Sequence, residues 1–230
     1  HMSKPQRYPD LIVQARTEDD VVAAVRYAAA NQLKVALRSG GHNSTGSALR
    51  DGGLLIDVSG MGCIAIYENR QIASIQPGVR SLELVTAAAR KGLSFPVPHC
   101  PSVGLAGFTL GGGIGWNYAQ RGGVSTHSIV GAEVVTADGA VRIANACTHP
   151  DLFWALKGAG GGSFGVVTRL TMRTREIPEF FGGVLGAIQA TSDAAFRRLI
   201  ARFTAFYAEA LFNPRWGESV YFRPDNALVL

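Results

Sequence analysis

The sequence predicts an α+β fold in which strands outnumber helices. Short runs of β-branched and aliphatic residues, bounded by Gly, Pro, Asn and Asp, recur along the chain, which is typical of strands. Stretches with helical spacing and cap residues interrupt these runs. Of the 230 residues, 47% are apolar and 17% are charged, so the chain can bury a hydrophobic core.

The first 60 residues predict a small β-α-β unit followed by a third strand. Thr17, with Asp20 three residues later, has the spacing of a capping box, and apolar residues then recur at helical intervals to about Asn31. Strands are expected around this helix and again before residue 60, at residues 11–15, 33–37 and 54–58. The second of these strands leads directly into a turn that contains Gly40 and Gly41.

Hairpins and further helices are expected in the middle of the chain. Ser81 is the expected cap of a helix to about residue 90, with Gly92 at its C-terminal cap, and Pro150 opens a helix that ends near residue 157. Asp138-Gly139 has the composition of a hairpin turn. The strands are expected at residues 63–67, 71–75, 129–136, 140–143 and 166–172.

The pattern of expected elements changes after residue 177. A strand is possible at residues 183–190, an amphipathic helix with an aromatic stripe is expected at 192–210, and two strands follow at 219–223 and 227–230. We expect the aromatic stripe to serve core packing. The last strand is expected to have no partner, so we expect 178–230 to be a truncated piece of a larger unit. His1-Met2-Ser3 resembles a cloning remnant.

Composition argues against several classes of function. The 22 basic and 17 acidic residues give a net charge of +5, but the basic residues are scattered, so nucleic-acid binding is not expected. No apolar run is long enough for a membrane span, and no secretory signal is visible, so a cytoplasmic location is expected.

The cysteines and histidines do not predict a disulfide framework or a metal site. The three cysteines are an odd number without short spacing, and Cys63 and Cys147 are expected to be small buried hydrophobes. His127 and His149 are expected to be a loop residue and a helix-entry residue. No cluster of His, Asp and Glu has the spacing of metal ligands, so no metal is expected.

Three glycine-dense loops are the main functional signal. Glycines expose backbone N–H groups, which bind phosphate when they line a concave turn. Residues 160–165 match GxGxxG, but a helix precedes them and a strand follows, which is the reverse of the order in a dinucleotide-binding Rossmann unit. No Gly-Lys-Ser/Thr run is present either, which argues against a P-loop. The loops lie at residues 38–43, 104–115 and 158–162.

Five ordered motifs make the sequence recognisable. The chain resembles the berberine bridge enzyme-like oxidoreductases of the vanillyl-alcohol oxidase superfamily, whose FAD-binding domain is of the PCMH type. The resemblance covers roughly residues 8 to 177. The motifs are RSGGHN at 38–43, HCPSVGLAG at 99–107, GGGIGWN at 111–117, AEVVTADG at 132–139, and DLFWAL at 151–156 with the stretch 160–168.

The resemblance implies a PCMH-type FAD-binding domain of two subdomains at residues 4–177. It implies that residues 178–230 begin an α+β substrate-binding domain, which the remaining polypeptide or a partner would complete. The residues it places at FAD are Arg38, Ser39, Gly40, Gly41, His42, Asn43, Cys100, Val103, Gly104, Gly107, Phe108, Gly112, Gly115, Asn117, Val134, Gly161 and Val166.

The resemblance also implies that the flavin is held covalently by two side chains. His42 would bond to the 8α-methyl carbon of the flavin, and Cys100 would bond to its C6 atom. The residue types suit this chemistry, because a neutral imidazole (reference pKa about 6.5) and a thiolate (about 8.5) are both nucleophiles. From the residues alone, His42 could instead be a hydrogen-bonding loop residue and Cys100 a buried thiol.

The expected function is that of an FAD-dependent oxidase. Val103 occupies the position at which similar proteins with Val admit dioxygen, although ordinary packing is the competing interpretation. Phe108 departs from the family, in which many members have His, and Ser163 replaces the usual Asn. A hydride would pass from an alcohol, sugar or secondary-metabolite substrate to flavin N5 and then to O2. A dehydrogenase with noncovalent or singly linked FAD and a non-catalytic flavin-binding fragment are the alternatives, and no catalytic base is assigned.

Overall fold

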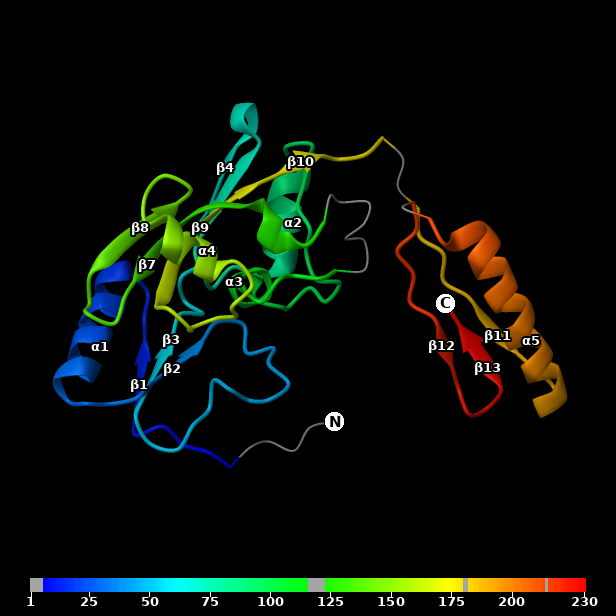
Figure 1. The fold of residues 1–230 in the computed structure, drawn as a ribbon, viewed down its shortest axis with the longest axis horizontal. Helices are drawn as coiled ribbons and strands as arrows, with labels where there is room; N and C mark the ends of the chain where they lie inside the picture. The colour runs from blue at the N-terminus through cyan, green and yellow to red at the C-terminus, as the bar shows by residue number, and fades with distance from the viewer. Residues whose placement is uncertain (1–5, 116–122, 180–181, 214) are drawn as a thin grey trace. The chain divides into compact units, whose positions relative to one another are not determined.

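A computed structural model describes residues 6–115, 123–179, 182–213 and 215–230 (Figure 1). Their contacts divide the chain into two compact units. The larger comprises His1–Gly115 and Val124–Ile177, and the smaller comprises Trp116–Gly123 and Pro178–Leu230. Both units mix helices and strands, which confirms the predicted α+β class.

The first sheet of the larger unit is parallel, with the strand order β1-β3-β2. It consists of β1 (Leu11–Gln14), β2 (Val35–Arg38) and β3 (Leu54–Asp57). The predicted β-α-β connection exists, but β3 lies between the two strands that it joins. All four residues of β3 are buried, because it has a neighbour on each side and a helix over it.

Helix α1 (Glu18–Ala30) packs against both sheets of this unit. The predicted capping box is present: the Thr17 hydroxyl accepts from the Asp20 amide, and the Asp20 carboxylate accepts from the Thr17 amide. Beyond β3, the helix contacts β7 and β9 of the second sheet. The Thr168 hydroxyl of β9 donates to Glu18 Oε2 at 2.5 Å. One core therefore includes residues from α1 and from both sheets.

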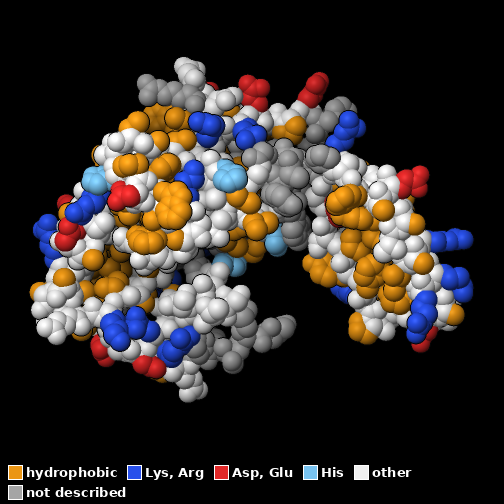
Figure 2. Space-filling view, in the orientation of Figure 1, with side chains coloured by type: hydrophobic (Ala, Val, Ile, Leu, Met, Phe, Trp, Pro, Cys, Tyr) orange, Lys and Arg blue, Asp and Glu red, His pale blue; other side chains and the backbone are white. Residues whose placement is uncertain are grey.

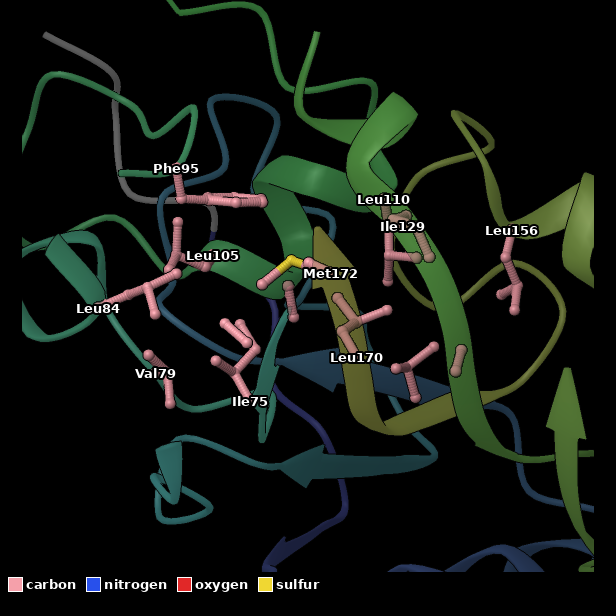
Figure 3. Close-up of a cluster of buried hydrophobic side chains, with 14 of the residues drawn as sticks. Ile75, Val79, Leu84, Phe95, Leu105, Leu110, Ile129, Leu156, Leu170 and Met172 are labelled. Carbon is pink, nitrogen blue, oxygen red and sulfur yellow. The ribbon is translucent and has the colours of Figure 1, made fainter. Parts of the chain in front are cut away.

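The second sheet is antiparallel, with the order β4-β5-β9-β7-β8. The two predicted hairpins, β4 with β5 and β7 with β8, are confirmed. Buried side chains such as Ile75, Leu170 and Met172 gather with Leu84 and Leu105 in the main core of the unit (Figure 3). The strands are β4 (Ile64–Tyr67), β5 (Ile72–Ile75), β7 (Ile129–Val135), β8 (Val141–Asn145) and β9 (Val166–Arg173).

Three helices pack near this sheet: α2 (Ser81–Ala89), α3 (Leu105–Leu110) and α4 (Pro150–Leu156). Pro150 is the first residue of α4, as predicted. The prediction that Ser81 caps α2 is wrong, because Arg80 is the N-cap and its amide donates to Glu83 Oε2 at 2.7 Å. The remaining elements of the unit are short: 3₁₀ helices η1 (Glu68–Arg70) and η2 (Ser125–Ser128), and β6 (Leu93–Ser94) paired with β10 (Arg175–Glu176).

The smaller unit contains α5 and a three-stranded antiparallel sheet. Phe196 and Phe203 of α5 meet Phe222 edge-on, with ring centroids 6.5 and 6.1 Å apart. The expected core packing is formed only in part, because α5 has no buried residue and Phe206 of the stripe is exposed. Hydrophobic side chains nevertheless remain exposed on the face of this unit shown in Figure 2. The elements are β11 (Ala187–Gln189), α5 (Asp193–Phe206), a π-helical turn η3 (Tyr207–Leu211), β12 (Tyr221–Phe222) and β13 (Ala227–Val229).

Strand β13 corrects one expectation from the sequence. The last strand was expected to have no partner, yet β13 is the central strand, with β11 on one side and β12 on the other. Leu228 is fully buried as a result. The possible strand at 183–190 is also shorter than expected, because only β11 forms within it.

Candidate functional site

Two of the predicted loops are in direct backbone contact. A Cβ atom on Gly104 would lie 2.7 Å from the amide nitrogen of Gly40 and 2.7 Å from Ser39 Oγ. A Cβ atom on Gly40 would collide with the backbone of Gly104 in turn. The Ser39 hydroxyl donates to the carbonyl of Pro77 at 2.5 Å, which ties the turn to the segment after β5. Glycine is therefore required at both positions by the close approach of the two loops.

The segment that carries Cys100 is fixed on the N-terminus of α2. The Ser81 amide donates to the Val103 carbonyl at 2.9 Å, and the Leu82 amide donates to the Pro101 carbonyl at 3.1 Å. The Ser81 hydroxyl donates to the Cys100 carbonyl at 2.5 Å. Ser81 therefore anchors the Cys100 loop instead of capping its own helix. The first-turn amides of α2 find acceptors in this way.

The two predicted attachment residues, His42 and Cys100, meet at a third side chain, Ser102. His42 Nε2 lies 2.9 Å from Ser102 Oγ, and Cys100 Sγ lies 3.4 Å from the same oxygen. His42 and Ser102 are exposed and Cys100 is half-buried, so all three can be reached from outside the chain. The loops thus bring together two nucleophiles that are far apart in the sequence.

The Cys100 thiol is shifted toward its reactive form. Hydrogen bonds from the Ser102 hydroxyl and then from the Ser102 amide lower the pKa of Cys100, and they outweigh the opposing effect of desolvation. The thiolate is the nucleophilic form of cysteine. Ser102 therefore favours the protonation state that covalent chemistry at Cys100 requires. Sequence analysis missed Ser102; the signal that could have found it was a hydroxyl two residues after Cys100.

The third glycine loop lies on the C-terminal end of α3. The amides of Gly158 and Gly160 donate to the Leu110 carbonyl at 3.0 and 2.9 Å. A Cβ atom on Gly161 would lie 3.8 Å from the Cα atom of Gly107, so these two predicted residues face each other. The loop and the helix therefore bring two exposed glycine backbones, Gly107 and Gly161, next to each other.

Nothing in the part of the chain that the structure describes requires glycine at position 107. It lies inside α3 without a positive φ, and a Cβ atom added to it would meet no atom of the described residues within 4 Å. Glycine inside a helix is unfavourable by about 1 kcal/mol relative to alanine. A group from outside the chain that approaches this backbone closely would account for it.

Other glycines of the second loop serve packing or backbone conformation. A Cβ atom on Gly115 would lie 2.8 Å from the Val97 carbonyl oxygen, and one on Gly113 would collide with Ser125. Gly112 has φ of +107° and open space around it. Phe108 is half-buried, with its ring 3.1 Å from where a Gly113 Cβ would be.

Arg38 forms an ion pair with Asp57 at the ends of β2 and β3. The Arg38 Nη2 and Asp57 Oδ2 atoms are 2.5 Å apart, and Asp57 is buried. Burial by itself raises the pKa of Asp57, but hydrogen bonds from Arg38 and from the amide and hydroxyl of Ser59 outweigh it, so the pKa lies below its usual value. This pair fixes the start of the first loop.

The remaining residues predicted to contact FAD lie partly in loops and partly in the hydrophobic cores. Asn43 Oδ1 accepts from the Thr45 amide at 3.0 Å, so this side chain shapes the loop that carries His42. Val103 is half-buried, while Val134 and Val166 lie in the two cores, so only their backbone could contact a ligand. Asn117 lies outside the described residues.

The expectation that Cys63 and Cys147 are buried is wrong, because both thiols are exposed. His149 is the N-cap of α4, at the helix entry as expected, and its Nδ1 lies 3.0 Å from the Ile143 carbonyl. Among the residues that the structure describes, no group of three or more His, Cys, Asp or Glu side chains could hold a metal ion. In the same part of the chain, no helix has both the length and the apolarity to cross a bilayer.

Comparison with known proteins identifies the family. Residues 9–145, more than half of the chain, match the family model described as FAD binding domain. The chain belongs to the FAD-binding domain family. The resemblance to berberine bridge enzyme-like proteins is thereby confirmed at the level of the family. The exposed backbones of Gly107 and Gly161, with His42 and Cys100 accessible, fit such a cofactor.

Several relatives of this FAD-binding domain are oxidases by name. The (R)-6-hydroxynicotine oxidase of Paenarthrobacter nicotinovorans is 41% identical over 170 residues, which cover 74% of this chain and 37% of that protein. The crystal structure of 6-hydroxy-D-nicotine oxidase from Arthrobacter nicotinovorans matches with a TM-score of 0.83 and 34% identity, over 91% of this chain and 46% of that one.

A further solved structure bears on the predicted attachment residues. Glucooligosaccharide oxidase from Acremonium strictum, described with a 6-S-cysteinyl, 8α-N1-histidyl FAD, matches with a TM-score of 0.78 and 25% identity. The match covers 91% of this chain and 44% of that protein. This chain thus spans less than half the length of each of these relatives.

Proposed function

We propose that this chain is the FAD-binding part of an oxidase in which His42 and Cys100 both hold the flavin covalently. The observation that carries the proposal is the meeting of these two side chains at Ser102 Oγ, 2.9 Å and 3.4 Å away. Two nucleophiles held at one exposed point suit attachment to a single ring at two positions. The glucooligosaccharide oxidase relative, named for a cysteinyl and histidyl FAD, supports the same reading.

Residues 4–177 would form the FAD-binding domain, and residues 178–230 would begin a substrate-binding domain. The turn at 38–43 and the exposed backbones of Gly107 and Gly161 would hold the dinucleotide through N–H groups and close approach. Bound FAD supplies a hydride acceptor at flavin N5 and passes the electrons on. The chain's own contribution is to anchor the ring and to fix the loops around it.

The proposed reaction takes a hydride from an alcohol, sugar or secondary-metabolite substrate, with dioxygen as the final electron acceptor. Val103 supports the choice of dioxygen, since a side chain of this size, half-buried in the same turn as Cys100, leaves more room than Leu. Replacing Val103 with Leu should slow the reoxidation of reduced protein in air by about tenfold or more. Fast reoxidation in both forms would leave Val103 as a packing residue, and slow reoxidation in the unaltered protein would favour a dehydrogenase.

Acid precipitation of the purified protein tests covalent attachment. Yellow colour is expected to stay in the pellet, to persist in His42→Ala and in Cys100→Ala through the remaining bond, and to be lost in the double variant. Peptide mass spectrometry would then locate each bond. Cys147→Ala, which alters another exposed thiol, is the matched control and should change nothing. Release of all colour from the unaltered protein would contradict the proposal.

A further inference from the structure

Among the residues that the structure describes, the Ser102 hydroxyl is the one group that contacts both proposed attachment residues. Among the described residues, Ser102 is the one hydrogen-bond partner of the His42 ring, and its oxygen also contacts Cys100 Sγ. We propose that Ser102 is a positioning residue for covalent flavin attachment, which accepts a hydrogen bond from His42 Nε2 and donates one to Cys100 Sγ. In each attachment a C–N or C–S bond replaces a C–H bond of the flavin, the proton goes to solvent, and the electron pair reduces the flavin ring, which the dioxygen of the proposed function reoxidises. This inference rests on the proposed function. It adds a residue, Ser102, that forms no bond to the flavin itself.

The number of protons available selects this arrangement. A serine hydroxyl has one proton to donate and two lone pairs to accept with. If it donates to the sulfur, the imidazole must donate to the oxygen, so His42 carries its proton on Nε2 and keeps a free lone pair on Nδ1. In the reverse arrangement the thiol must donate its proton to the oxygen, and the sulfur then stays protonated and weakly nucleophilic. Only the first arrangement leaves both side chains ready to attack.

Ser102 can position its neighbours because its own backbone is fixed. The Cys100 carbonyl accepts from the Ser81 hydroxyl at 2.5 Å and from the Val103 amide at 3.3 Å, so residues 100–103 form a closed turn. The Leu82 amide holds the Pro101 carbonyl next to Ser102. The loop that carries His42 is exposed from Gly41 onward, and Gly41 itself has φ of +73°. The Ser102 hydroxyl therefore ties an exposed imidazole to an anchored turn.

The direction of the Cys100 pKa agrees with this geometry. The hydroxyl of Ser102 is the largest cause that lowers the pKa of the thiol, and the Ser102 amide is the next. Removing the hydroxyl takes away the larger contribution and leaves the amide in place. The thiol of such a variant should ionise at higher pH.

Thiol reactivity and attachment rates together test the proposal. The full chain is prepared without flavin, and alkylation of Cys100 by iodoacetamide is followed against pH by peptide mass spectrometry. We expect Ser102→Ala to react about tenfold more slowly than the unaltered protein at neutral pH, and Ser102→Thr, which keeps the hydroxyl, to react within about twofold of it. Cys63 and Cys147, which are exposed, serve as internal references that should not change.

In the second arm, saturating FAD is added to the same proteins, and each covalent bond is quantified over time. Ser102→Ala should form both bonds about tenfold more slowly, whereas Ser102→Thr and the control Ser219→Ala, in the smaller unit, should resemble the unaltered protein. Ser102→Gly repeats the loss of the hydroxyl if the alanine variant folds poorly. Equal attachment rates with and without the hydroxyl would overturn the role of Ser102 while the oxidase proposal stands. Absence of covalent flavin in the unaltered protein would instead overturn the proposed function.

Discussion

Gly107→Ala separates the stability of the chain from its affinity for FAD. Alanine suits the helical backbone of α3 better than glycine, by about 0.5–1 kcal/mol, and the added methyl group meets no atom of the described residues within 4 Å. The flavin-free protein should therefore become more stable, with a melting temperature higher by about 1–4 °C. The same methyl group would enter the space proposed for FAD. Forcing one methyl group into a filled site costs about 1–3 kcal/mol, so FAD affinity should fall about tenfold or more.

The affinity is best measured where FAD exchanges freely, in a His42→Ala/Cys100→Ala background, by titration with FAD and by thermal melting without it. Gly62→Ala is the matched control, because Gly62 is exposed, has no positive φ and also has nothing within 4 Å of an added Cβ. The control should bind FAD normally. If Gly107→Ala also binds FAD within about twofold of its parent, the open space at Gly107 is not where the cofactor lies, and the reasoning fails.

Three further substitutions test the framework of the site. Gly40→Ala puts a methyl group 2.8 Å from Gly104 Cα and should lower the free energy of unfolding in urea by about 1–3 kcal/mol; a neutral result would contradict the close approach of the loops. Asp57→Asn should cost about 1–3 kcal/mol at neutral pH by breaking the pair with Arg38. The folded-state pKa of Asp57 is lowered from 3.8, so the stabilisation by its carboxylate is present above that pH and is lost as the pH falls below it. The free energy of unfolding of the variant, measured between pH 5 and 2, should therefore depend less on pH than that of the unaltered protein. Thr17→Ala should cost about 1 kcal/mol through loss of the α1 cap, and Thr17→Ser should restore it in the same urea assay.

Local signals in the sequence predicted the local structure well. The capping box of α1, the two hairpins and Pro150 at the start of α4 each depend on residues within a few positions of one another. Pairings between distant segments were not predictable in this way. The insertion of β3 between β1 and β2 depends on burial from both sides, which the sequence of residues 54–57 permits but does not specify.

The helix α3 was missed for a physical reason. Its six residues include Gly107 and lie in a glycine-rich stretch, so propensity argues against a helix there. Tertiary packing decides instead, because Leu105, Ala106, Thr109 and Leu110 form a buried face. Cys63 and Cys147 show the reverse error, since a residue type that is usually buried lies at the surface here.

The proposed attachment residues were predicted from motifs, but their relation to each other was not. His42 and Cys100 each belong to a recognisable motif, whereas the contact of both with Ser102 depends on the backbone junction of Gly40 and Gly104. A contact between two loops produces no periodic pattern in the sequence, unlike a helix or a strand. Only coordinates can show which intervening side chain lies between the two nucleophiles.

Helix α1 has a mechanical consequence for the larger unit. Val21, Ala24 and Val25 share one core with β3, β7 and β9. A hinge motion between the two sheets would therefore have to expose that core to solvent. Amide hydrogens in β3 and β9 should therefore exchange with solvent at one common free energy, that of cooperative unfolding of the whole unit. The loops at the sheet ends would then keep their spacing for as long as the unit remains folded.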